Sequence, residues 1–241
     1  MKNTKYVTSC FAILLLVLLA CPFSSCTIRK LSEIESKSSY SDDSAYDFSA
    51  WTKSGSSFNP KEYVEKNWDS KIIPLFLENS IDAVTVISSL RLEGSDTALA
   101  TYGVEKDDGS RMQGFKITAE ATVTEYDDSS RNGLIRIDFA PEDGVVDAIL
   151  QVGPVIKQTA IRDTLECVGF TDAGNQMFFA ELSDELNKMM RLKTIDPLDL
   201  TTITGKKIKF YGALKINEGD TDFSSIVITP VLIEILDDSQ N

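Results

Sequence analysis

The chain has 241 residues, of which 42% are hydrophobic and 25% are charged, which is the composition of a folded globular protein. It has no histidine, which excludes Ser-His-Asp and Cys-His catalysis and zinc sites with histidine ligands. The 24 basic and 37 acidic residues give a formal net charge of −13, which would repel nucleic acid, so we expect no nucleic-acid partner.

Residues 1–25 have the order of a secretory signal peptide. Lys2 and Lys5 precede an apolar run over residues 11–20, which is about half the length that a membrane-spanning helix needs. We therefore expect this segment to be cleaved from the mature protein.

Two cysteines follow the apolar run in contexts typical of bacterial lipoproteins, where the cysteine is acylated and becomes the new N-terminus. Cys21 directly follows the run but has the bulky Leu19 two positions before it, whereas Cys26 follows two serines and precedes a charged stretch. We favour Cys26 as the lipid attachment site and keep Cys21 as the alternative. Lipid on Cys26 leaves Cys167 without a disulfide partner, whereas lipid on Cys21 would allow Cys26 and Cys167 to pair.

Lipidation predicts a protein of the bacterial cell envelope, anchored to a membrane through its N-terminal lipid and facing the periplasm or the exterior. Residues 26–57 would form the lipidated N-terminus and a tether, because they are rich in Ser, Asp and Glu and offer little apolar surface to bury. Tyr46, Phe48 and Trp51 interrupt this stretch and are candidates to pack on the folded part.

Two helices are expected after the tether. Asn59 and Pro60 are typical of a helix start, which predicts a helix from residue 60 to about residue 71. We expect it to end there because Pro74 disfavours helical backbone in the residue before it. Apolar residues at helical spacing predict a second helix over residues 75–91.

The hydrophobic period then changes to two residues. Apolar and polar residues alternate from Phe115 onward, which predicts a half-buried strand over residues 115–124. A helix is predicted from residue 174 to about residue 192, and Pro230 indicates an edge position or a bulge in the last strand. The remaining strands are predicted at residues 135–139, 146–152, 208–214 and 225–236.

A weak internal similarity links the stretches that begin at residues 114 and 205, since each precedes an acidic loop and an Ile/Val-rich return strand. We therefore expect an α+β, β-rich fold with a helical lead-in and two small OB-like β-barrel units, each with a helix. The lead-in and first unit would cover residues 58–165, and the second unit would cover residues 166–241. Whether the similarity reflects a true duplication stays open.

A candidate binding site follows the third strand, where Gly153 and Pro154 end the strand sharply. Arg162 can offer a planar fork to a carboxylate, a phosphate or two sugar hydroxyls, with Asp163 orienting it. The alternative, which we favour, is a structural Arg162–Asp163 pair with Asn175 capping the next helix. The candidate binding residues are Thr159, Arg162, Asp163, Asn175 and Gln176.

We expect no catalytic residues, no metal site and no cofactor. The acidic pairs, such as Asp107-Asp108 and Asp127-Asp128, lack EF-hand spacing and are interpreted as polar turns and solvated ends. Cys167 has no basic neighbour in sequence that would activate it, so we expect an inert buried thiol.

Several short motifs occur in a recognisable order along the mature chain. They are Cys26-Thr27-Ile28-Arg29-Lys30-Leu31, Tyr63-Val64-Glu65-Lys66-Asn67-Trp68, Tyr102-Gly103, Gly153-Pro154-Val155, Thr159-Ala160-Ile161-Arg162-Asp163, Asn175-Gln176, Ala180, Leu186-Asn187, Gly205-Lys206 and Ile228-Thr229-Pro230-Val231. In this order they resemble the family of predicted periplasmic bacterial lipoproteins known as domain of unknown function 2291. One departure is Lys157-Gln158, where the family pattern has a glycine before the threonine.

The resemblance implies a β-rich fold with OB-like barrels and defines no catalytic residues. Members of the family are often encoded beside sugar-type ABC transporters, which implies an accessory role in the envelope. The leading hypothesis is therefore a non-enzymatic, lipid-anchored binding or accessory protein, with ABC transporter components or a carbohydrate as partners.

Two other functions stay open from the sequence. A carboxylate-dependent envelope hydrolase would be favoured by carboxyl groups that converge in a buried cleft, one of them with a raised pKa. A purely structural surface lipoprotein would be favoured by the lack of a pocket and by an exposed apolar patch.

Overall fold

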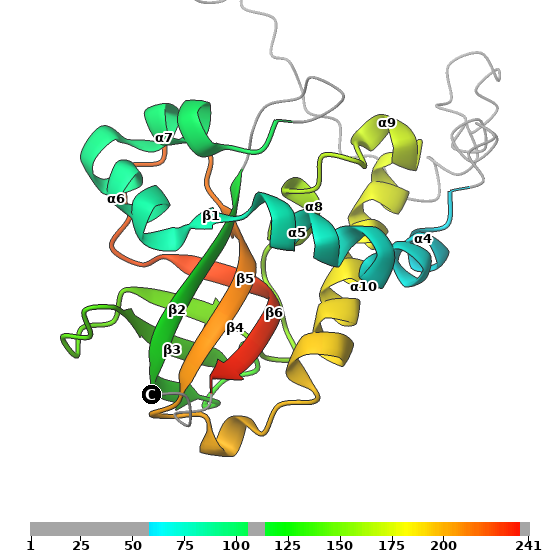
Figure 1. The fold of residues 1–241 in the computed structure, drawn as a ribbon. Coiled ribbons are helices and arrows are strands. Elements are labelled where there is room, and N and C mark those ends of the chain that lie inside the picture. The colour runs from blue at the N-terminus through cyan, green and yellow to red at the C-terminus, as the bar shows by residue number, and fades with distance from the viewer. Residues whose placement is uncertain (1–57, 106–113, 237–241) are drawn as a thin grey trace, which may run out of the picture. The chain divides into compact units, whose positions relative to one another are not determined.

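The computed structural model describes residues 58–105 and 114–236. The strands of this part are β1 (Ile81–Asp82), β2 (Gly114–Asp127), β3 (Leu134–Phe139), β4 (Ala148–Gln151), β5 (Lys207–Lys215) and β6 (Val227–Leu236). They form one sheet in the order β1-β2-β3-β4-β6-β5, and a further pairing of β2 with β5 closes all but β1 into a barrel (Figure 1). β4 and β6 are parallel, and the other neighbours in the barrel are antiparallel.

The expected α+β class with an OB-like barrel is confirmed, because five strands close into a barrel and a helical segment lies between the third and fourth of them. The expectation of two barrels is wrong. β2 pairs with β5 from Gly114↔Lys215 to Thr122↔Lys207, and β4 pairs with β6, so strands from both expected units share one barrel. Either group alone would leave open strand edges, and the two groups together close them.

The helical lead-in runs further than its proline suggests. α4 (Pro60–Asn67) is capped by Asn59 as expected, but it continues through a π-helical turn (Trp68–Ile72) into α5 (Ile73–Asn79). In the π-turn, the Ile73 N–H donates to the carbonyl oxygen of Trp68, five residues earlier. The wider turn places Pro74 in the first turn of α5, where its missing N–H is tolerated.

The predicted helix over residues 75–91 is interrupted at its centre. β1 pairs in parallel with β2 through Ile81↔Ile117, and Asp82 then caps α6 (Ala83–Glu93) by accepting a 2.9 Å hydrogen bond from the Thr85 N–H. The Asp82 cap is a local helix-start signal that the continuous apolar periodicity obscured. α7 (Ser95–Tyr102) follows at Gly94, whose φ of 87° favours glycine.

Two strands, β2 and β6, each have a local feature that bears on their prediction. Lys116 on β2 is buried, because Glu166 covers it and pairs with its ammonium group, so this end of the strand is buried on both faces. In β6 the register shifts so that Gly212 faces Pro230 and Tyr211 faces Leu232, which confirms a bulge at the proline. β6 has neighbours on both sides, so the proline does not mark an edge strand.

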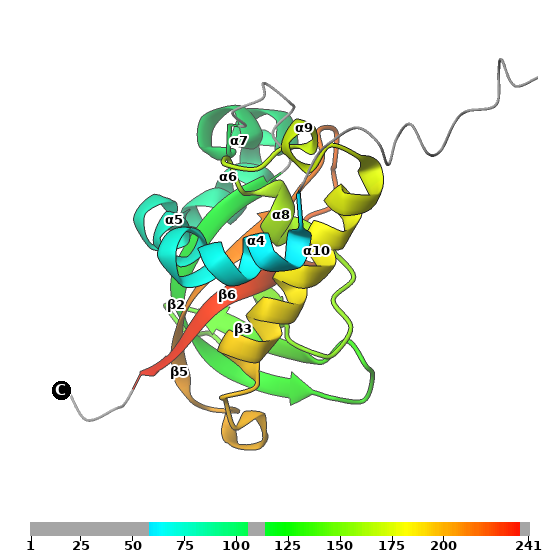
Figure 2. The ribbon, with the colours of Figure 1, turned by 90° about the vertical axis from the view of Figure 1, so that its right-hand side faces the viewer.

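The segment between β4 and β5 contains α8 (Ala160–Asp163), α9 (Phe170–Ala173), α10 (Gln176–Met190), a π-turn (Arg191–Ile195) and a 3-10 turn (Leu200–Thr202). α10 confirms the predicted helix and lies alongside the barrel, with α4 crossing it (Figures 1 and 2). Its apolar face, Leu182, Leu186 and Met190, is fully buried. Side chains from the barrel interior and the helices join in a single hydrophobic core that includes Trp68, Phe76, Phe115, Ile135, Leu150 and Phe210.

Candidate functional site

The loop between β4 and α8 is held against the turn between β2 and β3. The Gly153 N–H donates to the carbonyl oxygen of Asn132 at 2.7 Å, and the Val155 N–H donates to that of Arg131 at 3.0 Å. A Cβ atom on Gly153 would lie 2.1 Å from the Asn132 carbonyl carbon. Gly153 therefore permits a backbone contact that no other residue allows, and this contact fixes the start of the loop.

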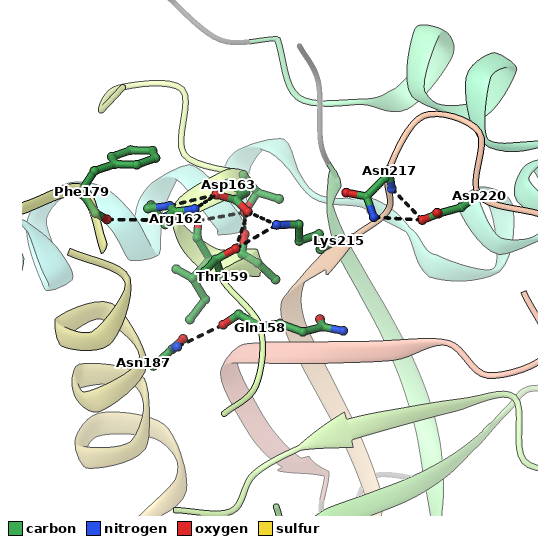
Figure 3. A network of polar contacts seen from close by, with 12 residues as sticks. Gln158, Thr159, Arg162, Asp163, Phe179, Asn187, Lys215, Asn217 and Asp220 are labelled. Carbon is green, nitrogen blue, oxygen red and sulfur yellow. Dashed lines mark hydrogen bonds and ion pairs between the residues drawn. The ribbon is translucent and has the colours of Figure 1, made fainter. Parts of the chain in front are cut away.

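Three of the predicted site residues, Thr159, Arg162 and Asp163, come together (Figure 3). The Arg162 guanidinium donates to Asp163 Oδ1 through Nε at 2.9 Å and Nη2 at 2.7 Å. Thr159 Oγ1 donates to Asp163 Oδ2 at 2.5 Å. Asp163 is only 3% exposed, so its carboxylate lies inside the protein with its hydrogen bonds satisfied by neighbours.

Lys215 is the residue of this cluster that the sequence analysis missed. Its ammonium group lies 2.6 Å from Asp163 Oδ2 and 2.9 Å from Thr159 Oγ1. Arg162 is held from its other side, because Nη1 donates to the Phe179 carbonyl oxygen at 3.1 Å and the guanidinium carbon lies 4.0 Å from the centre of the Phe179 ring. Two cations thus share one buried carboxylate, and the cluster links α8 to β5 and α10.

The pKa of Asp163 is lowered from its ordinary value. Burial by itself would raise this pKa, but hydrogen bonds from Lys215, Thr159 and Arg162 and the two positive charges outweigh it. Asp163 is therefore ionised at neutral pH and acts as an acceptor at the centre of the cluster.

Asn175 and Gln176 do not join this cluster through any hydrogen bond of the described residues. Asn175 caps α10, with its Oδ1 accepting from the Phe178 N–H at 2.8 Å, as the favoured alternative predicts. Gln176 is exposed on the first turn of α10.

Cys167 is half-buried, with its Sγ atom 3.6 Å from the Tyr63 hydroxyl. Burial and the neighbouring thiol raise the pKa of Tyr63 above its usual range, so its hydroxyl stays protonated in this contact between α4 and the segment before α9. The two candidate lipid attachment sites, Cys26 and Cys21, lie outside the described residues, as does the predicted tether.

A groove of about 530 Å³ lies between the loop after β4 and the C-terminal half of α10. Its lining residues are 154–156 of the loop, Asp184, Asn187 and Lys188 of α10, and Arg191, Leu192 and Asp196 after it. We call this feature the α10 groove. A second hollow of about 350 Å³ lies on the other side of Pro154 and is lined by Tyr126 and residues of the turn between β2 and β3.

The sequence pointed to the loop after Gly153 and Pro154 but joined it to the start of α10. The other wall of the groove was missed because its lining residues lie in the second half of that helix and after it, about 30 residues from the loop. Within residues 58–105 and 114–236, no group of three or more Cys, Asp or Glu side chains is placed to hold a metal ion. No helix in the same part of the chain is long and apolar enough to cross a membrane.

Comparison with protein families decides the relationship that the motifs suggested. The model of the predicted periplasmic lipoprotein family, domain of unknown function 2291, matches residues 15–234. The chain belongs to this family. Membership in the family confirms the expected envelope location.

A crystal structure of an OB-fold protein from Thermotoga maritima is similar to this chain, with a TM-score of 0.60 and 19% sequence identity. The match covers 74% of this chain and 99% of the other chain. It agrees with the OB-like barrel and, at this identity, concerns the fold alone. No curated protein matches this chain.

Proposed function

We propose that this family member is a non-enzymatic, lipid-anchored envelope protein that acts as an auxiliary, ligand-binding component of a sugar-type ABC transporter. The observation that carries the binding role is the α10 groove, a surface hollow of about 530 Å³ between the loop after β4 and α10. Its volume is in the range of small-molecule sites, roughly 300–1,000 Å³. The groove also argues against the purely structural alternative, which a surface without a pocket would have favoured.

The ionisation of the carboxyl groups supports binding over hydrolysis. A carboxylate-dependent hydrolase needs a general acid whose pKa is raised so that it holds a proton near neutral pH. In the described part of the chain, every carboxyl group with a clearly shifted pKa is shifted downward by the hydrogen bonds that it accepts. These groups are Asp127, Glu142, Asp163, Asp199 and Asp222.

The anchor defines where the protein would work. Lipid on Cys26, followed by the tether through residue 57, would hold the barrel near the membrane in which a transporter sits. An auxiliary component fits better than a primary receptor, because the 216 residues after a cleavage at Cys26 are few and β-rich for a two-lobed sugar receptor.

The test is a cross-linking pull-down of the full-length protein from its native envelope, with mass spectrometry of the captured proteins. The control is the Cys26→Ala variant, which keeps the folded part and lacks the anchor. Enrichment of permease or solute-receptor subunits with the anchored protein over the control supports the proposal. Equal capture by the two forms, or capture without transporter subunits, contradicts it.

A further inference from the structure

The α10 groove is formed before any ligand enters, because both of its walls are fixed by hydrogen bonds. Gly153 and Val155 tie one end of the loop to the turn between β2 and β3. At the other end, Asn187 Nδ2 donates to the Gln158 carbonyl oxygen at 3.1 Å and ties the loop to α10. A preformed site loses little conformational entropy when it binds a ligand.

The charges of the groove balance, although the chain as a whole carries −13. Asp184 and Asp196 contribute two carboxylates, and Lys188 and Arg191 contribute two cations. Arg191 Nη2 lies 2.8 Å from Asp196 Oδ1, and their side chains stay 30% and 47% exposed, so each keeps polar atoms available. A ligand with a net charge would meet a like charge in this groove, whereas a neutral ligand with donors and acceptors meets partners for both.

One acceptor beside the groove lacks a donor. Asn187 Oδ1 is buried and accepts no hydrogen bond within the described residues. A buried oxygen without a donor is unfavourable. Asn187 is thus a polar side chain of the groove wall whose hydrogen bonds are not all made by the described residues.

The groove also offers an aliphatic surface. Leu192 is 58% exposed at the π-turn after α10 and lines the groove. Pro154 and Ile156 line the groove from its loop side. Aliphatic surface next to carboxylate, amide and guanidinium groups matches a sugar ring, which has C–H faces and a rim of hydroxyls.

We infer that the α10 groove binds an uncharged, hydroxyl-rich small molecule of the size of a mono- or disaccharide. This inference rests on the ligand-binding role proposed above and assigns that role to one site and one ligand class. It places the site next to, and separate from, the buried cluster of Thr159, Arg162 and Asp163.

The test is an NMR titration of the soluble protein from residue 27 onward with neutral and charged sugars. The neutral probes are D-glucose, D-galactose, D-ribose, D-xylose and maltose, and the charged probes are D-glucuronate and D-glucose 6-phosphate. We expect at least one neutral sugar to shift the backbone amide signals of residues 154–156 and 184–196, and to bind more tightly than its charged analogue. Absence of shifts with every neutral sugar, or shifts confined to other residues, would overturn the inference.

A pair of variants separates binding from folding. Leu192→Glu places a carboxylate on the aliphatic side of the groove and should weaken the binding of the neutral sugar at least about tenfold, which equals about 1.4 kcal/mol. The matched control is Leu92→Glu, because Leu92 is 85% exposed and does not line the groove. Its helix, α6, and α10 lie on opposite sides of the view in Figure 1. Both variants should keep the parent melting temperature, and equal sugar affinity in the two variants would contradict the inference.

The outcomes also separate this inference from the proposed function. Capture of transporter subunits without sugar shifts in the groove refutes the groove assignment and leaves the accessory role in place. Sugar binding in the groove without capture of transporter subunits supports the site and refutes the association.

Discussion

Lys215 at the end of β5 and Asp163 at the end of α8 form an ion pair in which Nζ and Oδ2 are 2.6 Å apart. The two residues are 52 positions apart in the chain, and no local pattern in the sequence links them. Their contact ties α8 to the barrel and makes the predicted Arg162–Asp163 pair part of a larger buried cluster. We therefore expect this cluster to contribute to the stability of the folded protein.

Arg162→Lys should destabilise the protein. A lysine can replace neither the two-pronged contact with Asp163 nor the contacts with Phe179, because its ammonium is a point charge. We expect a loss of about 1–3 kcal/mol, since buried charged groups lose hydrogen bonds. For a domain of this size that lowers the melting temperature by roughly 2–4 °C per kcal/mol, as followed by circular dichroism. An unchanged melting temperature with lost ligand binding would instead support the recognition role first considered for Arg162.

The lowered pKa of Asp163 predicts a specific loss of stability in acid. Because the folded pKa lies below the unfolded value of about 3.9, this contribution is fully present above about pH 4 and is lost as the pH falls through the folded value. Asp163→Asn removes the contribution at every pH. The difference in melting temperature between parent and variant should therefore be large at pH 7 and shrink toward pH 3. A difference that stays constant over this range would show that Asp163 does not titrate in this way.

Gly153→Ala should destabilise the loop that forms one wall of the groove. The added Cβ would overlap the backbone of Asn132, and overpacking of this kind costs about 1–3 kcal/mol or more. The matched control is Gly94→Ala, where a Cβ meets no atom within 4 Å and only the positive φ opposes the substitution. We expect the larger drop in melting temperature for Gly153→Ala, and an equal or smaller drop would contradict the close contact.

The sequence predicted elements well where a local signal exists. The alternation in β2, the cap at Asn59 and the apolar face of α10 each depend on residues close together in the chain. Pro74 misled the prediction, since the π-turn before it is a property of the packed helix and leaves no local signal. The second helix was overextended because its apolar period continues across the break at Asp82.

The pairing of the strands could not be predicted from local sequence patterns. The pairing of β2 with β5 joins residues about 90 positions apart, and the similar patterns at residues 114 and 205 come from two antiparallel neighbours in one barrel. The same limit applies to the site. Arg162 and Asp163 are adjacent and were found, whereas Lys215 and the two walls of the α10 groove meet only through the fold.

Residues 27–57 should be dispensable for the folding of the rest of the chain. The truncated chain from Phe58 keeps the ring contact between Phe58 and Tyr63, whose centroids are 5.4 Å apart. Its melting temperature, measured by calorimetry, should equal that of the chain from Thr27. A decrease of several degrees would show that Tyr46, Phe48 or Trp51 packs on the folded part, since about 1 kcal/mol corresponds to roughly 2–4 °C.

The anchored state of the mature protein is the basis of the whole proposal, and the intact mass of the protein extracted from its native envelope measures it directly. We predict a chain that begins at Cys26 and carries two or three acyl chains, with the lipid lost in Cys26→Ala and kept in Cys21→Ala. Lipid kept in Cys26→Ala and lost in Cys21→Ala would move the anchor to Cys21. A mature chain without lipid in the parent protein would contradict the account.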